Sequence, residues 1–283
     1  MTPRAHHRRL LAALAALVLS LVAVLAGAPS PAAAYAPAGQ ATIHPGVQMF
    51  TDGAQCTANF VFTDGSNLYI GYAAHCAGLG EATDTNGCQA GTLPVGTPVE
   101  IDGASRPGTL AYSSWATMQA VGETDADACA YNDLALVRID PADHDKVNPS
   151  IPHWGGPTGL NTTGVSALSR VYSYGNSSLR QGIALLSPKT GVSLGTTGGG
   201  WTHPLYTVTP GIPGDSGSAF LDAQGRALGV LSTLSIAPTP LSNNVSDLNK
   251  GLEYMRSHGG PNATLVLGDL PFNGNQLPLG LGL

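Results

Sequence analysis

The sequence of 283 residues predicts an all-β fold, either a barrel or a sandwich. Its strand signals are short and are separated by turn residues, which is typical of antiparallel β proteins. Charged residues make up only 11% of the chain, and glycine is abundant, with 37 residues. Together with many serines and threonines, this composition suits a secreted, β-rich protein.

The first 34 residues have the layout of a secretory signal peptide. A basic start containing Arg4, Arg8 and Arg9 precedes an apolar run of 17 residues, 10–26, and the alanines at 32–34 offer a cleavage site. An uncleaved membrane anchor is the alternative, because such a run approaches the length that crosses a bilayer. We expect cleavage, and therefore a secreted, extracellular protein with no membrane contact after signal removal.

The net charge limits the class of partner. It is −6 for the whole chain and −9 without residues 1–34, which contain three arginines and no acids. Nucleic acids and anionic membranes favour a basic face, so neither is expected as the main partner.

The first predicted strands form a hairpin. Residues 59–62 and 68–71 are apolar runs on either side of Asp64 and Gly65, a residue pair that favours a tight hairpin turn. The second of these strands ends shortly before His75.

A buried strand is predicted at 134–139, a compact apolar run with Asp133 at its start. Residues 140–164 follow, rich in proline, glycine and asparagine and without periodicity, which indicates a connection between two halves of the protein. A second hairpin is predicted from the runs 218–222 and 227–232, which lie directly after Ser216.

A helix is predicted near the C-terminus, from a cap at Ser246 to about His258, and two glycines follow it as a stop signal. Residues 261–283 are an additional tail that we expect to be partly ordered at most. The residues that recur on one face of the helix are Leu248, Leu252 and Met255.

Three motifs carry the chemistry: A-A-H-C with His75, N-D-L-A-L with Asp133, and G-D-S-G-S with Ser216. A serine hydroxyl becomes a strong nucleophile only when a base removes its proton, and a carboxylate orients that base. The order along the chain is His, Asp, Ser. It differs from the Ser, acid, His order of α/β-hydrolases and from the Asp, His, Ser order of subtilisins.

The motifs and their order resemble the chymotrypsin-like serine proteases of bacterial type, with a looser likeness over residues 43–258. The resemblance implies an all-β fold of two antiparallel six-stranded β-barrels with a C-terminal helix. Residues 35–150 would form the first barrel, residues 151–260 the second barrel and helix, and residues 261–283 the tail. His75 and Asp133 would lie on the first barrel and Ser216 on the second, with the active site in the cleft between them.

The resemblance assigns Ser216 as nucleophile, His75 as general base and then general acid, and Asp133 as the carboxylate that orients the imidazole. The backbone N–H groups of Gly214 and Ser216 would form the oxyanion hole. The implied function is that of a secreted serine endopeptidase that acts on polypeptide substrates without a cofactor or metal. An esterase with the same triad and an inactive secreted binding protein of the same fold are the alternatives, and the oligomeric state stays open.

The aspartate before the nucleophile, Asp215, is expected to form a buried ion pair that holds the oxyanion loop, as in the resembled family. The sequence contains no activation cleavage site that would supply an N-terminal amine as its partner. An internal arginine is therefore expected, and Arg170 and Arg180 are the candidates.

The expected substrate-binding residues are Pro210, Ser232 and Leu234. Pro210 stands where a trypsin-like pocket needs an acid, so a preference for Arg or Lys is not expected. Residues 232–234 resemble the strand that pairs with an extended peptide, and Leu234 stands where a glycine opens the pocket in many relatives. The hypothesis is a restricted pocket for a small or medium apolar side chain.

Four cysteines in the exported part imply disulfides, and the sequence alone allows three pairings. The resemblance favours a bridge between Cys56 and Cys76, which leaves Cys88 to pair with Cys129. A zinc site is the competing interpretation, but the sequence lacks a C-x-x-C motif and a paired histidine spacing.

Overall fold

The computed structural model describes residues 35–79, 85–234 and 241–277. The chain divides into two units, Met1–Ala34 and Tyr35–Leu283, and the second is described here. The predicted signal peptide and the last six residues of the predicted tail lie outside the described residues. In the described part of the chain, no helix is both long and apolar enough to cross a membrane.

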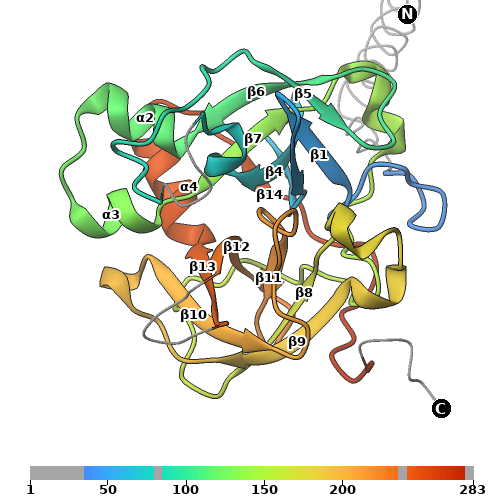
Figure 1. The fold of residues 1–283 in the computed structure, drawn as a ribbon. Helices are drawn as coiled ribbons and strands as arrows, with labels where there is room; N and C mark the ends of the chain where they lie inside the picture. Colours follow the sequence, from blue (N-terminus) through green and yellow to red (C-terminus); the bar gives the residue numbers. More distant parts are fainter. Residues whose placement is uncertain (1–34, 80–84, 235–240, 278–283) are drawn as a thin grey trace, which may run out of the picture. The chain divides into compact units, whose positions relative to one another are not determined.

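The N-terminal half of this unit forms an eight-stranded antiparallel sheet with the order β14-β3-β4-β7-β6-β5-β1-β2 (Figure 1). The predicted first hairpin is confirmed, because β3 pairs with β4 and places Val61 opposite Ile70. The strand predicted after Asp133 is β7, which lies between β4 and β6. The strands are β1 Gln48–Thr51, β2 Ala54–Thr57, β3 Val61–Thr63, β4 Leu68–Ala73, β5 Pro98–Ile101, β6 Gly108–Ser113, β7 Leu134–Arg138 and β14 Thr264–Leu265.

The C-terminal half forms a closed barrel of six strands with the order β10-β13-β12-β11-β8-β9. The second predicted hairpin, between the runs 218–222 and 227–232, is confirmed as β11 paired with β12, and Gln224 and Gly225 lie in its turn. Six buried apolar side chains fill this barrel: Val171, Leu205, Phe220, Leu228, Leu231 and Val245. The strands are β8 Arg170–Tyr174, β9 Pro188–Ser193, β10 Thr202–Thr207, β11 Ala219–Leu221, β12 Ala227–Leu234 and β13 Asn243–Asp247.

The strand count of the N-terminal half differs from the six predicted from the resemblance. The C-terminal tail contributes β14, which pairs antiparallel with β3 and places Thr264 opposite Thr63. This pairing satisfies backbone groups that an edge strand would otherwise leave open. A segment more than 200 residues away in sequence therefore extends the first sheet, which no local pattern predicts.

Among the residues that the structure describes, three α-helices and five 3₁₀ segments accompany the strands. The predicted C-terminal helix is α4, Leu248–Ser257, with Leu248, Leu252 and Met255 buried as expected. Its N-cap is Asp247 and not Ser246, because the Asp247 carboxylate accepts from Lys250 N at 2.7 Å. The remaining segments are α2 Ser114–Val121, α3 Ala126–Tyr131, η1 Ala74–Ala77, η2 Pro141–Lys146, η3 Ser178–Arg180, η4 Ala184–Leu186 and η5 Gly198–Gly200.

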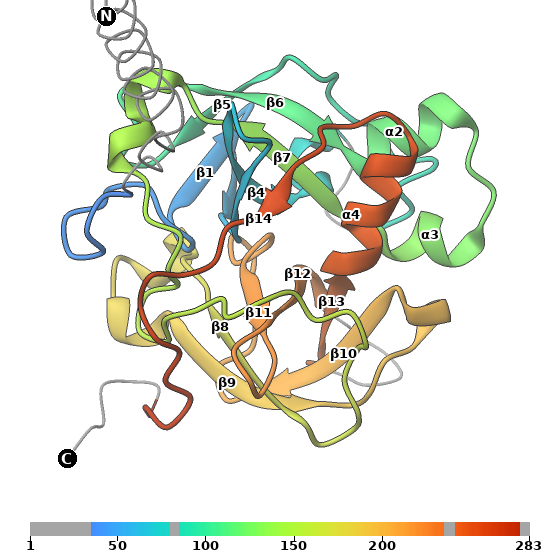
Figure 2. The ribbon, with the colours of Figure 1, turned by 180° about the vertical axis from the view of Figure 1, so that it is seen from behind.

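The described part of the tail, residues 261–277, contacts both halves. After β14 it runs along the connecting segment, where Gly268 N donates to Pro157 O at 2.9 Å and Asn273 N donates to Trp154 O at 2.8 Å. Phe272 then meets Tyr172 of β8 edge to face, with 5.2 Å between ring centroids. Figure 2 shows this segment passing from the N-terminal sheet to the C-terminal barrel.

Candidate active site

His75 and Asp133 lie at neighbouring strand ends. Strands β4 and β7 pair so that Ala73 is opposite Leu134, which brings the residues directly after β4 beside the residue before β7. Asp133 Oδ2 lies 2.7 Å from His75 Nδ1, and Asp133 Oδ1 accepts from the His75 backbone N–H at 2.9 Å. Because a carboxylate can only accept, Nδ1 carries the hydrogen, and Nε2 is the ring nitrogen left to act as a base.

The surroundings of the pair favour the charged imidazole. The Asp133 side chain is 4% exposed and the His75 side chain 26% exposed. Burial disfavours charge on the ring, but the adjacent Asp133 carboxylate outweighs it and raises the pKa of His75 above the ordinary 6.5.

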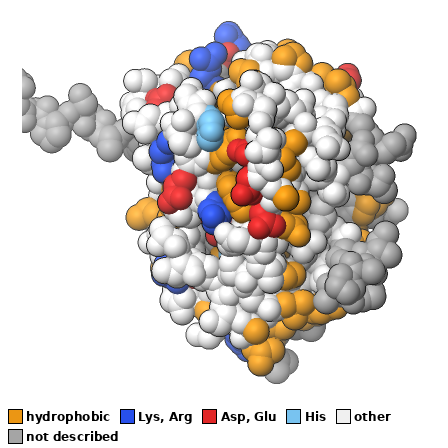
Figure 3. Space-filling model, turned by 90° about the vertical axis from the view of Figure 1, so that its left-hand side faces the viewer, with side chains coloured by type: hydrophobic (Ala, Val, Ile, Leu, Met, Phe, Trp, Pro, Cys, Tyr) orange, Lys and Arg blue, Asp and Glu red, His pale blue; other side chains and the backbone are white. Residues whose placement is uncertain are grey.

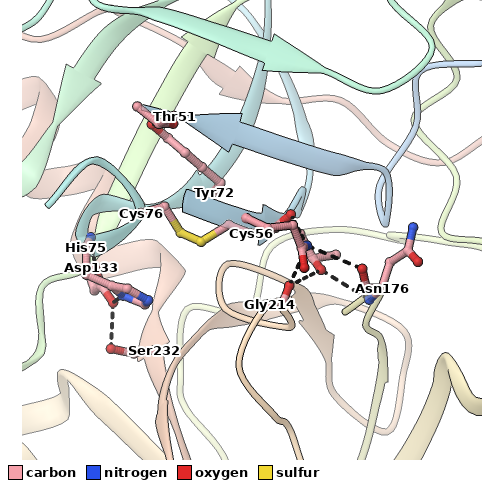
Figure 4. Close-up of a disulfide and its surroundings, with 11 residues drawn as sticks. Thr51, Cys56, Tyr72, His75, Cys76, Asp133, Asn176, Gly214 and Ser232 are labelled. Atoms are coloured by element: carbon pink, nitrogen blue, oxygen red, sulfur yellow. Dashed lines mark hydrogen bonds and ion pairs between the residues drawn. A yellow bond between two sulfur atoms is a disulfide. The ribbon is translucent and has the colours of Figure 1, made fainter. Parts of the chain in front are cut away.

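Two serines from the C-terminal half hold Asp133. Ser232 Oγ donates to Asp133 Oδ2 at 2.6 Å (Figure 4). Asp133 N donates to Ser246 Oγ at 3.2 Å. Ser246, predicted as a helix cap, is thus engaged by Asp133 instead. Ser232 is expected from the sequence to bind substrate, and its bond to Asp133 was not predicted, because only the packing of β12 against the N-terminal sheet creates that contact.

Ser216, the predicted nucleophile, lies on the loop before β11 and is partly exposed. Its carbonyl accepts from Thr57 N at 2.8 Å, and a Cβ atom on the next residue, Gly217, would lie 2.9 Å from Ala73 N. The loop that carries Ser216 therefore packs directly on the end of β4, two residues before His75. Among the described residues, Ser216 Oγ forms no hydrogen bond, so it is not bonded to His75 here.

Two backbone amides beside Ser216 are available as donors. Neither Gly214 N nor Ser216 N donates a hydrogen bond to another described residue. Ser218 N donates to Asp215 O at 3.1 Å. In a trans peptide the C=O and the N–H point in opposite directions, so this bond fixes the direction of the Ser216 N–H.

Gly214 needs to be glycine. Its φ of +92° lies in the left-handed region, and a Cβ atom would collide with Gln55 Oε1. Its carbonyl accepts from Thr57 Oγ1 at 2.7 Å and from Gln55 Nε2 at 3.0 Å, so β2 of the N-terminal sheet clamps the loop. Figure 4 shows these bonds on the other side of the Cys56–Cys76 disulfide from His75 and Asp133.

Asp215 is fully buried and has two cationic partners. Arg180 Nη2 lies 2.6 Å from Asp215 Oδ2. Lys189 Nζ lies 3.0 Å from the same oxygen and forms an ion pair with it, but the geometry of this contact is not that of a hydrogen bond. Burial opposes ionisation of Asp215, but Lys189 and Arg180 outweigh it and hold the pKa of Asp215 below its ordinary value. Of the two arginine candidates, Arg180 is therefore the partner of Asp215, whereas Arg170 is exposed. The second partner, Lys189, was not predicted from the sequence.

The structure contains the two disulfides that the resemblance implies, Cys56–Cys76 and Cys88–Cys129. The first joins β2 to η1 and so ties the Gly214 clamp to the segment that carries His75. Cys56, His75 and Cys76 have potential metal-ligand atoms within 4.8 Å of one another. The two sulfurs are bonded to each other, so they are not free thiolates that could bind a metal.

The predicted substrate-binding residues lie on two neighbouring segments. Pro210 is partly exposed, and Leu234 at the end of β12 is 42% exposed. Asn243 of β13 connects the segments, since its Oδ1 accepts from Gly211 N at 2.8 Å and its Nδ2 is 3.4 Å from Thr233 O. A Cβ atom on Gly211 would lie 2.7 Å from Leu231 Cδ2 and 2.9 Å from Asn243 Nδ2, so these two side chains fill the space beside Gly211.

The surface near α2 and α3 is mixed in character. On the face that Figure 3 draws, acidic side chains lie beside hydrophobic ones, and lysine and arginine side chains are scattered.

Two other acids close to Asp133 in the sequence, Asp125 and Asp127, lie at the start of α3. Asp125 is the N-cap of this helix, because its carboxylate accepts from Ala128 N at 2.7 Å. Asp125 therefore has a local structural role, unlike Asp133.

Comparison with known proteins gives a fold but no sequence family. No family model matches the chain, and no curated protein matches it. Protease A of Thermobifida fusca matches in structure at 19% identity with a TM-score of 0.51, covering 80% of this chain and 99% of that chain. The chain thus has the fold of the chymotrypsin-like serine proteases.

Two further solved structures match at lower scores. A Nocardiopsis protease matches at 19% identity with a TM-score of 0.47, and the chymotrypsin of Cellulomonas bogoriensis at 18% identity with a TM-score of 0.46. Each match covers 79% of this chain and 98% of the other.

Proposed function

We propose that this protein is a secreted serine endopeptidase in which Ser216 forms an acyl-enzyme. The observation that carries the proposal is the hydrogen bond between His75 Nδ1 and the buried Asp133, at the strand end on which the Ser216 loop packs. The fold supports it, and the two disulfides support an oxidising compartment, as expected of an exported protein.

In the proposed reaction, His75 Nε2 takes the proton of Ser216 Oγ as that oxygen attacks the carbonyl carbon of the scissile peptide. The carbonyl oxygen becomes an oxyanion, and the N–H groups of Gly214 and Ser216 stabilise it. The protonated His75 then gives its proton to the leaving amine. Water, deprotonated by His75, releases the acyl group and restores Ser216.

Asp133 keeps the imidazole in the tautomer that this reaction needs and stabilises its charged form. Ser232 and Ser246 of the C-terminal half bond to Asp133. The general base His75 therefore lies on the N-terminal half, while the residues that position it come from both halves. This arrangement makes the site depend on the packing of the two halves.

We further propose that the pocket takes a small or medium apolar side chain. Asn243 and Leu231 fill the space beside Gly211, and Leu234 lies at the end of the neighbouring strand. None of the residues at 210–212 and 232–234 is acidic, so a preference for Arg or Lys is disfavoured. A peptide library cleaved mainly after Arg, Lys or Glu would contradict this proposal.

Two alternative functions use the same fold. An esterase with the same triad would hydrolyse small esters but leave casein intact. An inactive secreted binding protein would hydrolyse neither, although His75, Asp133, Ser216 and Gly214 are all present. These residues favour an enzyme over a binding protein.

Reaction with a fluorophosphonate probe tests the proposal. The wild-type protein should be labelled at Ser216 and should degrade casein, and Ser216→Ala should abolish both. The matched control is Ser178→Ala, because Ser178 is exposed and its side chain forms no hydrogen bond to a described residue. A wild-type protein that is folded, unlabelled and without activity on casein would reject the proposal.

A further inference from the structure

The carbonyl of Pro213 has a dedicated hydrogen-bond donor. Ser177 Oγ donates to Pro213 O at 2.6 Å. Pro213 and Gly214 share one trans peptide, in which the C=O and the N–H point in opposite directions. The direction of the Pro213 carbonyl therefore sets the direction of the Gly214 N–H, the proposed oxyanion donor.

The conformation of the loop does not by itself determine the orientation of the Pro213–Gly214 peptide. A flip of the Pro213–Gly214 peptide changes ψ of Pro213 and φ of Gly214, and glycine populates positive and negative φ about equally. The flip would turn the Gly214 N–H away from the oxyanion hole. An anchor from outside the loop is needed to select one orientation.

The other anchors act on different peptide bonds. Thr57 and Gln55 bind the Gly214 carbonyl, which belongs to the next peptide, and Ser218 N binds the Asp215 carbonyl. Among the described residues, Ser177 alone bonds to the Pro213 carbonyl.

Ser177 is itself held rigidly. It is 1% exposed, and its backbone N–H donates to Asp215 Oδ1 at 3.0 Å. Its hydroxyl accepts from Leu179 N at 3.2 Å, so the single hydroxyl hydrogen is free to donate to Pro213 O. The preceding residue, Asn176, is fixed through its N–H to Thr57 Oγ1 at 3.1 Å.

We propose that Ser177 is a positioning residue that sets the oxyanion hole by holding the Pro213–Gly214 peptide with its N–H toward the substrate. This inference rests on the proposed function. It assigns to the segment between β8 and η3 a part in the reaction, although no atom of that segment needs to touch the substrate.

The test compares Ser177→Ala with wild type and with Ser177→Thr, which keeps the hydroxyl. Loss of one anchoring hydrogen bond should lower kcat about 10-fold with little change in KM, since the oxyanion forms only in the transition state. The affinity for a peptide aldehyde, which forms a tetrahedral adduct on the nucleophile, should fall by a similar factor. Ser177→Thr should restore both, and Ser178→Ala should leave both unchanged.

Two further comparisons keep the test decisive. If Ser177→Ala does not fold, Ser177→Thr and Ser177→Val form a pair of equal size that differ in the hydroxyl alone. A variant without the hydroxyl that keeps wild-type kcat and aldehyde affinity overturns the inference. A wild type that neither reacts with fluorophosphonate nor cleaves peptides instead overturns the proposed function, so the two failures are distinguishable.

Discussion

Arg180 Nη2 lies 2.6 Å from Asp215 Oδ2, and the side chains are 9% and 0% exposed. Asp215, the residue before the proposed nucleophile Ser216, thus has its charge partner within the chain and does not need a new N-terminal amine. Because Lys189 binds the same oxygen, two cations share one buried carboxylate. These ion pairs anchor the loop that carries Gly214 and Ser216, the proposed oxyanion donors.

Arg180→Met should destabilise the protein and slow the reaction. One cation, Lys189, would remain beside Asp215, so we expect a loss of about 2 kcal/mol in the free energy of unfolding, below the usual cost of an unpaired buried charge. Denaturant unfolding and kcat/KM measure the two effects. Arg170→Met is the matched control, because exposed Arg170 should change stability by less than about 0.5 kcal/mol.

Asp215→Asn should remove a stabilisation that depends on pH. The pKa of Asp215 is lower in the folded state than in the unfolded state, so ionised Asp215 stabilises the fold above the unfolded pKa of about 3.9. That contribution disappears as pH falls through the folded pKa. The difference in unfolding free energy between wild type and Asp215→Asn should therefore be largest near neutral pH and shrink below about pH 4. A difference that grew with acidity would contradict this account.

Gly214→Ala should abolish most of the activity without unfolding the protein. The new Cβ would collide with Gln55 Oε1 and would strain a backbone at φ +92°, so the Gly214 N–H would shift from its position. Loss of one oxyanion donor costs about 10² to 10³ in rate. Measured kcat should fall by this factor while KM changes little. Gly53→Ala is a control for strain alone, because Gly53 also has a positive φ but has open space around it.

His75 should titrate above 6.5 in the folded protein, because Asp133 raises its pKa. Since the reaction needs neutral His75, kcat/KM should rise as pH increases through this raised pKa. NMR titration of the imidazole in Ser216→Ala checks the value. Adding Asp133→Asn should lower the pKa of His75, because burial then acts without the carboxylate. An unchanged pKa would show that Asp133 is not the cause.

The tail should hold the two halves together. A chain ending at Gly260 loses β14 and the contact between Phe272 and Tyr172, and we expect its melting temperature to fall. Phe272→Ala, which removes a partly buried aromatic side chain, should cost about 2 kcal/mol of unfolding free energy. Leu277→Ala, at an exposed position, is the control. A truncated chain as stable as wild type would show that the tail is dispensable.

Local patterns predicted much of the fold. The Asp64-Gly65 and Gln224-Gly225 turns lie between paired strands, and the apolar run after Asp133 is a buried strand, because turn chemistry and burial are encoded over a few residues. The predicted cap of α4 was wrong by one position, since both Ser246 and Asp247 suit a cap. In the structure Asp247 accepts from Lys250 N and caps the helix, while Ser246 accepts from Asp133 N.

From the amino-acid sequence, the residue types of the candidate site could be predicted: a histidine, an aspartate and a glycine-framed serine, in an order typical of one fold. The groups that hold these residues in place could be identified only from the packing of the folded chain. The contacts of Lys189 with Asp215, of Ser177 with Pro213 and of Ser232 with Asp133 join residues that are 26 to 99 positions apart in the chain. Such contacts have no local periodicity or turn signal, because they arise only when separate strands pack and bury the same carboxylate or carbonyl.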